Sequence, residues 1–134
     1  MGTRSFVGVM VGDKCRAIYV HYDGYLSGVG AELQDYKTQA EVEELIADGD
    51  RSSLTDGFYK ERGETGVNPK NYATFAELFE AADGCWAEWY YVFKDGEWYC
   101  GNTYSGSKLC KTLTPYAEAC EVYKAECEAE ECAE

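Results

Sequence analysis

The sequence has few prolines and no long apolar run. Two prolines occur in 134 residues, and no segment approaches the roughly 18 to 20 consecutive apolar residues that a membrane-spanning helix needs. The N-terminal residues also lack the apolar stretch of a signal peptide. We therefore expect a cytoplasmic protein without membrane contact. The length suits one domain with a hydrophobic core and is short for two.

Positive charge is also scarce. Lys and Arg together number 12 against 25 Asp and Glu, which gives a formal net charge of -13. Such a charge repels nucleic-acid phosphates and anionic lipids, so direct binding to nucleic acid is not expected. The same charge attracts basic surfaces, including the grooves in which other proteins hold nucleic acid. The alternative interpretation is a charge that only keeps the protein soluble.

Paired metal ligands and a disulfide framework are missing too. The seven cysteines are an odd number and form no C-x-x-C pair, whereas zinc sites use close pairs and small secreted scaffolds an even number. We predict reduced thiols, most of them buried as small apolar residues. No metal site and no cofactor are predicted.

Two stretches of the sequence predict β-hairpins. Residues 6–10 and 15–20 are rich in Val, Ile, Phe and Tyr and flank a turn at 11–14. Residues 86–102 place aromatic strands around Asp95-Gly96, a pair typical of a tight primed turn. The first strand of this hairpin is apolar on both faces, so both must be covered or one must meet a partner. The two faces carry Trp86, Tyr90 and Val92, and Trp89, Tyr91 and Phe93.

Capping signals predict helices. Residues 38–49 and 74–84 each begin with a Thr placed three residues before a Glu, which is the capping-box arrangement. Each segment ends in a glycine, Gly49 or Gly84, that suits the left-handed position after a helix. Ser27 is the expected cap of a short helix. A last helix is expected to start at Pro115 and to bury a stripe of Tyr116, Cys120, Tyr123 and Cys127.

These signals together predict a single α+β domain over residues 1–134. An antiparallel sheet of about four strands, built from two hairpins, is packed by about three or four helices. Residues 50–73 show no clear period and are expected to form an irregular connection. Residues 128–134 are expected to fray as an acidic tail.

Carboxylates on the two glutamate-rich helices form the predicted partner-binding surface. Negative charges spaced along a helix imitate the phosphates of a duplex, which is a physical route to blocking a DNA-binding enzyme. A solvated helix face without a partner is the plainer interpretation. The predicted surface comprises Glu41, Glu43, Glu44, Asp48, Asp50, Glu118, Glu121 and Glu128.

The only histidine lies in the stretch YVHYDGYLSGVG at residues 19–30. His21 is a candidate general base oriented by Asp23, because an imidazole beside a carboxylate titrates near neutral pH. Residues i and i+2 of a strand lie about 6 to 7 Å apart, so their contact would require the turn to curl back. No catalytic nucleophile is marked. The structural alternative is a strand end that turns into a helix.

A second candidate site would bind a small molecule such as a nucleotide. Gly28 and Gly30 open a helix, and helix N-termini bind phosphate. The established glycine-rich phosphate-binding patterns are absent from this stretch, so close backbone packing is the alternative. The candidate ligand-binding residues are Arg4, His21, Asp23, Tyr25 and Arg62.

Five segments of the chain carry a recognisable pattern. They are TRSFVGV at 3–9, AIYVHYDGYLSGVGAELQDY at 17–36, VEELIADGDRSSL at 42–54, KERGE at 60–64 and YVFKDGEWY at 91–99. These segments resemble a family of small proteins of phages, prophages and related bacteria. The family pattern runs Ser-Arg-Ser, then His-Trp-Asp-Gly-Tyr-Pro-x-Gly-Val-Gly, then Gly-Asp-x-Ser-Ser-Leu. This chain has Tyr22 where the family often has Trp, and Leu26 where Pro is usual.

The resemblance implies a phage or mobile-element origin, a bacterial host and a shared fold, and it implies no mechanism. The cysteine-rich end beyond residue 100 lies outside the resemblance. The motif positions that carry over are His21, Asp23, Gly24, Tyr25, Gly28 and Gly30.

Charge, size and resemblance together predict a non-catalytic phage accessory protein. We expect it to bind and inhibit a host antiviral defence component, of the anti-CRISPR or anti-restriction type, by competing for a basic nucleic-acid-binding site. One alternative is a protein that binds or sequesters a nucleotide signal. A third is a small enzyme that uses His21 and Asp23. Assembly into a homo-oligomer stays open.

Overall fold

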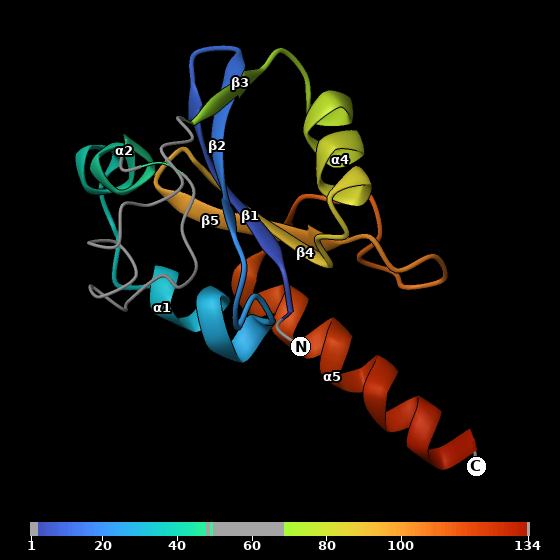
Figure 1. Cartoon of the computed structure of the whole chain (residues 1–134). Helices are drawn as coiled ribbons and strands as arrows, with labels where there is room; N and C mark the ends of the chain where they lie inside the picture. Colours follow the sequence, from blue (N-terminus) through green and yellow to red (C-terminus); the bar gives the residue numbers. More distant parts are fainter. Residues whose placement is uncertain (1–2, 48, 50–68, 134) are drawn as a thin grey trace.

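The computed structural model describes residues 3–47, 49 and 69–133, which form a sheet with helices packed on it (Figure 1). The elements follow along the chain as β1 (Ser5–Val11), β2 (Lys14–Val20), the π-helical turn η1 (Leu26–Gly30), α1 (Ala31–Leu33), α2 (Gln39–Ala47), β3 (Lys70–Tyr72), α4 (Phe75–Gly84), β4 (Trp89–Lys94), β5 (Glu97–Asn102), β6 (Thr114–Pro115) and α5 (Tyr116–Ala133).

Six strands of the described residues form one sheet, in the order β3-β2-β1-β4-β5-β6. Both predicted hairpins are present, because β1 pairs antiparallel with β2 and β4 antiparallel with β5. The α+β class is therefore confirmed.

The expectation of about four antiparallel strands is wrong. Strand β1 pairs in parallel with β4, where Ser5 faces Trp89. The short strands β3 and β6 extend the two edges, and β3 lies in the segment 50–73 that was expected to be irregular. Hairpin signals are local, whereas the pairing of two hairpins depends on all the chain between them. The pattern of a single strand therefore does not reveal it.

The turns of both hairpins follow from their residues. Gly12 has φ of 66° between β1 and β2, and Asp95 and Gly96 have φ of 52° and 81° between β4 and β5. Positive φ at these positions matches the turn to the twist of the flanking strands. The predicted primed turn at Asp95-Gly96 is confirmed.

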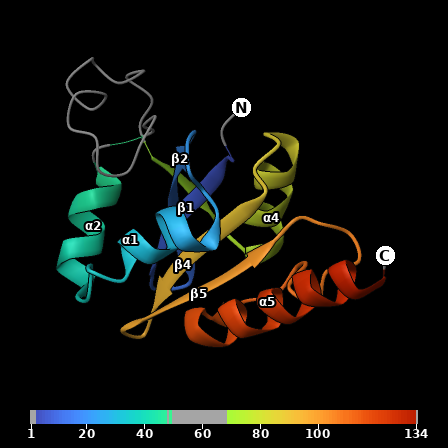
Figure 2. The same cartoon turned by 90° about the horizontal axis from the view of Figure 1, so that it is seen from below.

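Helices lie on both sides of β4 (Figure 2), and a hydrophobic core covers each of its two apolar faces. On one face Tyr90 and Val92 pack with Leu78, Phe79 and Ala82 of α4. The other core joins Trp89, Tyr91 and Phe93 to apolar residues of the helices that follow β2 and of α5. The helical members of this second core are Leu26, Val29, Leu33, Val42, Leu45, Ile46 and Ala119.

Side-chain caps begin two of the helices as predicted. In the box before α2, the Glu41 backbone N–H donates to Thr38 Oγ1 at 3.2 Å and the Thr38 N–H donates to Glu41 Oε1 at 3.2 Å. Before α4, the Glu77 N–H donates to Thr74 Oγ1 at 3.2 Å. The Glu77 carboxylate accepts from Ala73 N–H at 2.7 Å, one residue earlier than the simple box. Both N-terminal predictions are confirmed.

The other helix ends agree with the predictions only in part. Gly49 has the expected left-handed backbone, with φ of 85°. Ser27 does not cap a helix, because η1 already begins at Leu26, whose side chain is buried. Gly84 is the last residue of α4 and not its left-handed terminator. Helix α5 spans Tyr116–Ala133, and the fraying of residues 128–134 stays a prediction.

The described cysteines are free thiols that differ in burial. Cys15 and Cys100 are buried and Cys85 is exposed. Burial raises the pKa of the Cys15 and Cys100 thiols to about 12. Burial is confirmed for these two thiols only, so the expectation that most of the cysteines are buried holds in part. Three others are half-buried, namely Cys110, Cys120 and Cys127.

We expect iodoacetamide to alkylate Cys85 of the native protein at least about 100-fold faster than Cys15 or Cys100, because the accessible thiolate is the reacting species. Peptide mapping by mass spectrometry against time, near neutral pH, gives the rates. In guanidinium chloride the rates should converge. Equal rates in the native protein would contradict the burial described above.

Candidate functional site

Two tyrosine hydroxyls hold the 19–30 motif against the sheet. Tyr91 on β4 donates to the carbonyl of Gly24 at 2.6 Å, and Tyr116 on α5 donates to the carbonyl of Leu26 at 2.8 Å. Burial raises the pKa of Tyr91 well above its ordinary value, so this phenol stays protonated and able to donate. The hydroxyls thus pair backbone carbonyls where the chain leaves β2 and enters η1.

The glycines of the motif permit this close packing. A Cβ on Gly24 would lie 2.7 Å from the Cβ of Ser5, and one on Gly30 would lie 2.9 Å from Cε1 of Tyr116. A Cβ on Gly28 would overlap the carbonyl oxygen of residue 23. Close backbone packing therefore accounts for these glycines without a phosphate ligand.

His21 and Asp23 make hydrogen bonds with different tyrosines. His21 is half-buried, and its Nδ1 forms a hydrogen bond of 2.8 Å with the Tyr19 hydroxyl. Its ring packs edge-on against the Tyr22 ring, with 4.6 Å between the ring centroids. The Asp23 carboxylate accepts a hydrogen bond from the Tyr25 hydroxyl at 3.3 Å. The hydrogen bonds described for this imidazole and this carboxylate therefore join each of them to a tyrosine.

The described residues of the predicted small-molecule site have different surroundings. Asp23 and Tyr25 contact each other, whereas Arg4 lines a separate cleft whose lining includes neither of them nor His21. Arg62 lies outside the described residues.

Replacing Tyr91 by Phe should lower the free energy of unfolding by about 1 to 3 kcal/mol, because the buried Gly24 carbonyl loses its donor. Urea unfolding measures the change. Tyr99→Phe is the matched control, since the Tyr99 hydroxyl bonds the exposed Glu97 carboxylate, and it should cost less than about 0.5 kcal/mol. A Tyr91→Phe variant as stable as this control would refute the structural role of the hydroxyl.

The described members of the predicted acidic surface lie on two separate helices, α2 and α5 (Figure 2). Glu41 also has a structural role, because its carboxylate accepts the Thr38 N–H at the N-terminus of α2. Asp48 and Asp50 lie outside the described residues. Glu43 is half-buried, and the exposed members without a capping bond are Glu44, Glu118, Glu121 and Glu128.

A tryptophan occupies the left-handed position that ends α4. Trp86 has φ of 64°, its N–H donates to the carbonyl of Asp83 at 3.2 Å, and the Ala87 N–H donates to that of Ala82 at 2.9 Å. These two bonds form a Schellman motif, whose left-handed residue is usually Gly. The expectations that Gly84 fills this position and that Trp86 lies on a strand face are both wrong.

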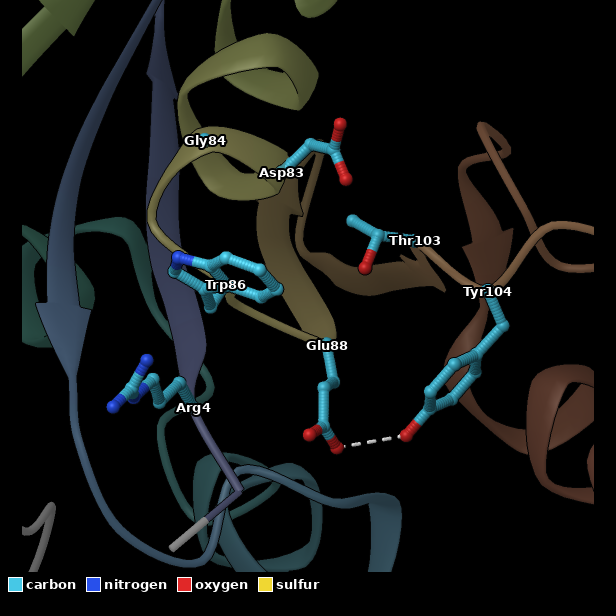
Figure 3. A pocket seen from close by; sticks show the side chains of 7 residues that line it. All are labelled: Arg4, Asp83, Gly84, Trp86, Glu88, Thr103 and Tyr104. Atoms are coloured by element: carbon cyan, nitrogen blue, oxygen red, sulfur yellow. Dashed lines mark hydrogen bonds between the residues drawn. The ribbon is translucent and has the colours of Figure 1, made fainter.

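Trp86 lines an open cleft of about 520 Å³ between the end of α4, the start of β1 and the segment after β5 (Figure 3). Its side chain is 78% exposed, the largest value among the exposed large apolar residues described. Of the lining residues, only Arg4 was predicted as a site residue. The others were missed because they come from separate parts of the chain and share no sequence motif. They are Arg4, Asp83, Gly84, Trp86, Glu88, Thr103 and Tyr104.

Comparison with models of protein families, with curated proteins and with solved structures finds no match for this chain. The resemblance to the phage family therefore stays a prediction. Among the described helices, none combines the length and apolar character needed to cross a bilayer.

Hydrogen bonds fix one wall of the cleft. The Tyr104 hydroxyl donates to Glu88 Oε2 at 2.8 Å, and Thr103 Oγ1 donates to the carbonyl of Ala87 at 2.8 Å. The Tyr104 ring also packs edge-on against Trp89. Burial, and then the Glu88 carboxylate, raise the pKa of Tyr104, so its hydroxyl stays a donor. The Glu88 carboxylate is thereby held in place within the cleft.

We expect Trp86→Gly to raise the free energy of unfolding by about 1 kcal/mol, because Gly adopts the left-handed backbone without the penalty of a side chain. Trp86→Ala keeps a Cβ and should gain little. Urea unfolding of the two variants separates the backbone effect from loss of the indole. A Gly variant less stable than wild type would mean that packing of the indole outweighs the backbone cost.

Proposed function

We propose that this protein is a non-catalytic phage accessory protein that binds a host antiviral defence component and blocks its basic nucleic-acid-binding site. The observation that carries the proposal is the net charge of -13 together with exposed carboxylates on α2 and α5. A basic groove that attracts nucleic acid attracts such a surface by the same long-range field. The proposed place of action is the cytoplasm of a bacterial host.

Helix α5 supplies the longest line of negative charge. Residues 116–134 contain seven Glu and one Lys. At a rise of about 1.5 Å per residue, Glu118 and Glu128 lie about 15 Å apart along the helix. That distance spans several phosphate steps of about 3.4 Å along one DNA strand. The C-terminal part of α5 extends away from the sheet (Figure 1), which leaves this line accessible to a partner.

The geometry of the 19–30 motif supports a structural role for this segment over a catalytic one. Its glycines are in close contact with neighbouring chain segments, its carbonyls pair with Tyr91 and Tyr116, and His21 and Asp23 bond separate tyrosines. The most distinctive part of the sequence therefore has a structural explanation.

The test begins with affinity capture from lysate of a bacterial host, followed by measurement of the affinity for the captured protein. Glu121→Gln with Glu128→Gln should weaken binding by about 2- to 30-fold at low salt, because each exposed ion pair contributes about 0.2 to 1 kcal/mol. The loss should shrink as salt is added, and duplex DNA should release the captured protein.

The matched control removes two exposed acids elsewhere, by Asp35→Asn and Glu80→Gln. It should bind nearly as tightly as wild type. Capture of no nucleic-acid-binding defence protein, or equal affinities for the two double variants, would disprove the proposal.

A further inference from the structure

We propose that the cleft at Trp86 receives an arginine side chain of the bound protein, an inference that rests on the proposed function. The guanidinium stacks on the indole of Trp86, in a cleft whose lining carries the carboxylates of Asp83 and Glu88. The cleft is thus a second contact region, built from residues other than the acidic line of α5.

The exposed indole is the first argument. Trp86 is 78% exposed, whereas Trp89 and Trp98 are 1% and 5% exposed. Tryptophan is the aromatic ring that binds cations best, and arginine is its most frequent cationic partner. Trp and Arg are also the residues that most often dominate protein interfaces. An indole held over a cleft by a fixed helix end suits that role.

The charges around the indole are the second argument. Asp83 and Glu88 both line the cleft, and Tyr104 holds the Glu88 carboxylate in place. Figure 3 shows the guanidinium of Arg4 directed away from both carboxylates. A planar guanidinium both stacks on a ring and donates paired hydrogen bonds to a carboxylate, which an ammonium does not do.

The openness of the site favours a protein side chain over a free small molecule. Small-molecule sites usually bury about 70 to 90% of the ligand, whereas this cleft leaves most of Trp86 in solvent. An arginine presented by a partner brings surrounding protein surface with it, and that surface covers the exposed indole. The net charge of -13 makes a basic partner the complementary one.

The direct test titrates the protein with the capped peptide acetyl-Gly-Arg-Gly-amide while the tryptophan indole N–H resonances are followed by NMR. Trp86→Gly identifies the Trp86 signal, and the Trp98 indole, which donates to the carbonyl of Tyr36, is an internal reference. We expect the Trp86 signal alone to move with peptide concentration. The same peptide with citrulline, which keeps the shape of arginine without its charge, should bind at least about fivefold more weakly.

Variants connect the response to the carboxylates. Asp83→Asn with Glu88→Gln should weaken peptide binding by about 3- to 10-fold, and the amide oxygen introduced by Glu88→Gln can still accept the Tyr104 hydrogen bond. Glu80→Gln, which changes an exposed acid on the same helix as Asp83, should leave binding unchanged. A Trp86 signal that does not move, equal binding of the citrulline peptide, or an equal loss in the Glu80→Gln variant would overturn the proposal.

The peptide titration needs no host partner, so the two proposals fail separately. If the peptide moves the Trp86 signal but no defence protein is captured, the arginine site stands and the proposed function falls. If a defence protein is captured and Trp86→Gly does not weaken its binding, the cleft proposal falls and the function stands. We expect Trp86→Gly to lower the affinity for the captured protein by at least about tenfold.

Discussion

The arrangement of the whole molecule depends on burying strand β4 on both faces. Its side chains point alternately into two cores, with Tyr90 and Val92 on one face and Trp89, Tyr91 and Phe93 on the other. Water must be excluded from both, so α4 covers one face while η1, α1, α2 and α5 cover the other. The parallel pairing with β1 completes the burial.

The same burial explains why the 19–30 motif is structural. Tyrosines on β4 and α5 can lie in the core only if their hydroxyls find partners, and the carbonyls of Gly24 and Leu26 provide them. The motif is thereby locked between a strand and a helix that are distant in sequence. The surfaces that we propose to meet a partner are along α5 and at the end of α4.

The end of α4 combines good local geometry with an unfavourable residue. The hydrogen bonds of a Schellman motif are formed, yet its left-handed position holds Trp86, a bulky residue for which that backbone is costly. Places where a sequence departs from its own local rules are often functional. Here the departure coincides with the most exposed indole and with a charged cleft, which is why we assign binding to it.

The sequence alone determined what depends on neighbouring residues: the capping boxes at Thr38 and Thr74, the turn at Asp95-Gly96, the two hairpins, the α+β class and the excess of negative charge. Hydrogen bonds within a few residues and simple counting suffice for these. Only the tertiary structure decided the β1 to β4 pairing, the attachment of the 19–30 motif to Tyr91 and Tyr116, and the cleft at Trp86. Each depends on contacts between segments far apart in the chain, whose entropy of closure and packing no local pattern encodes.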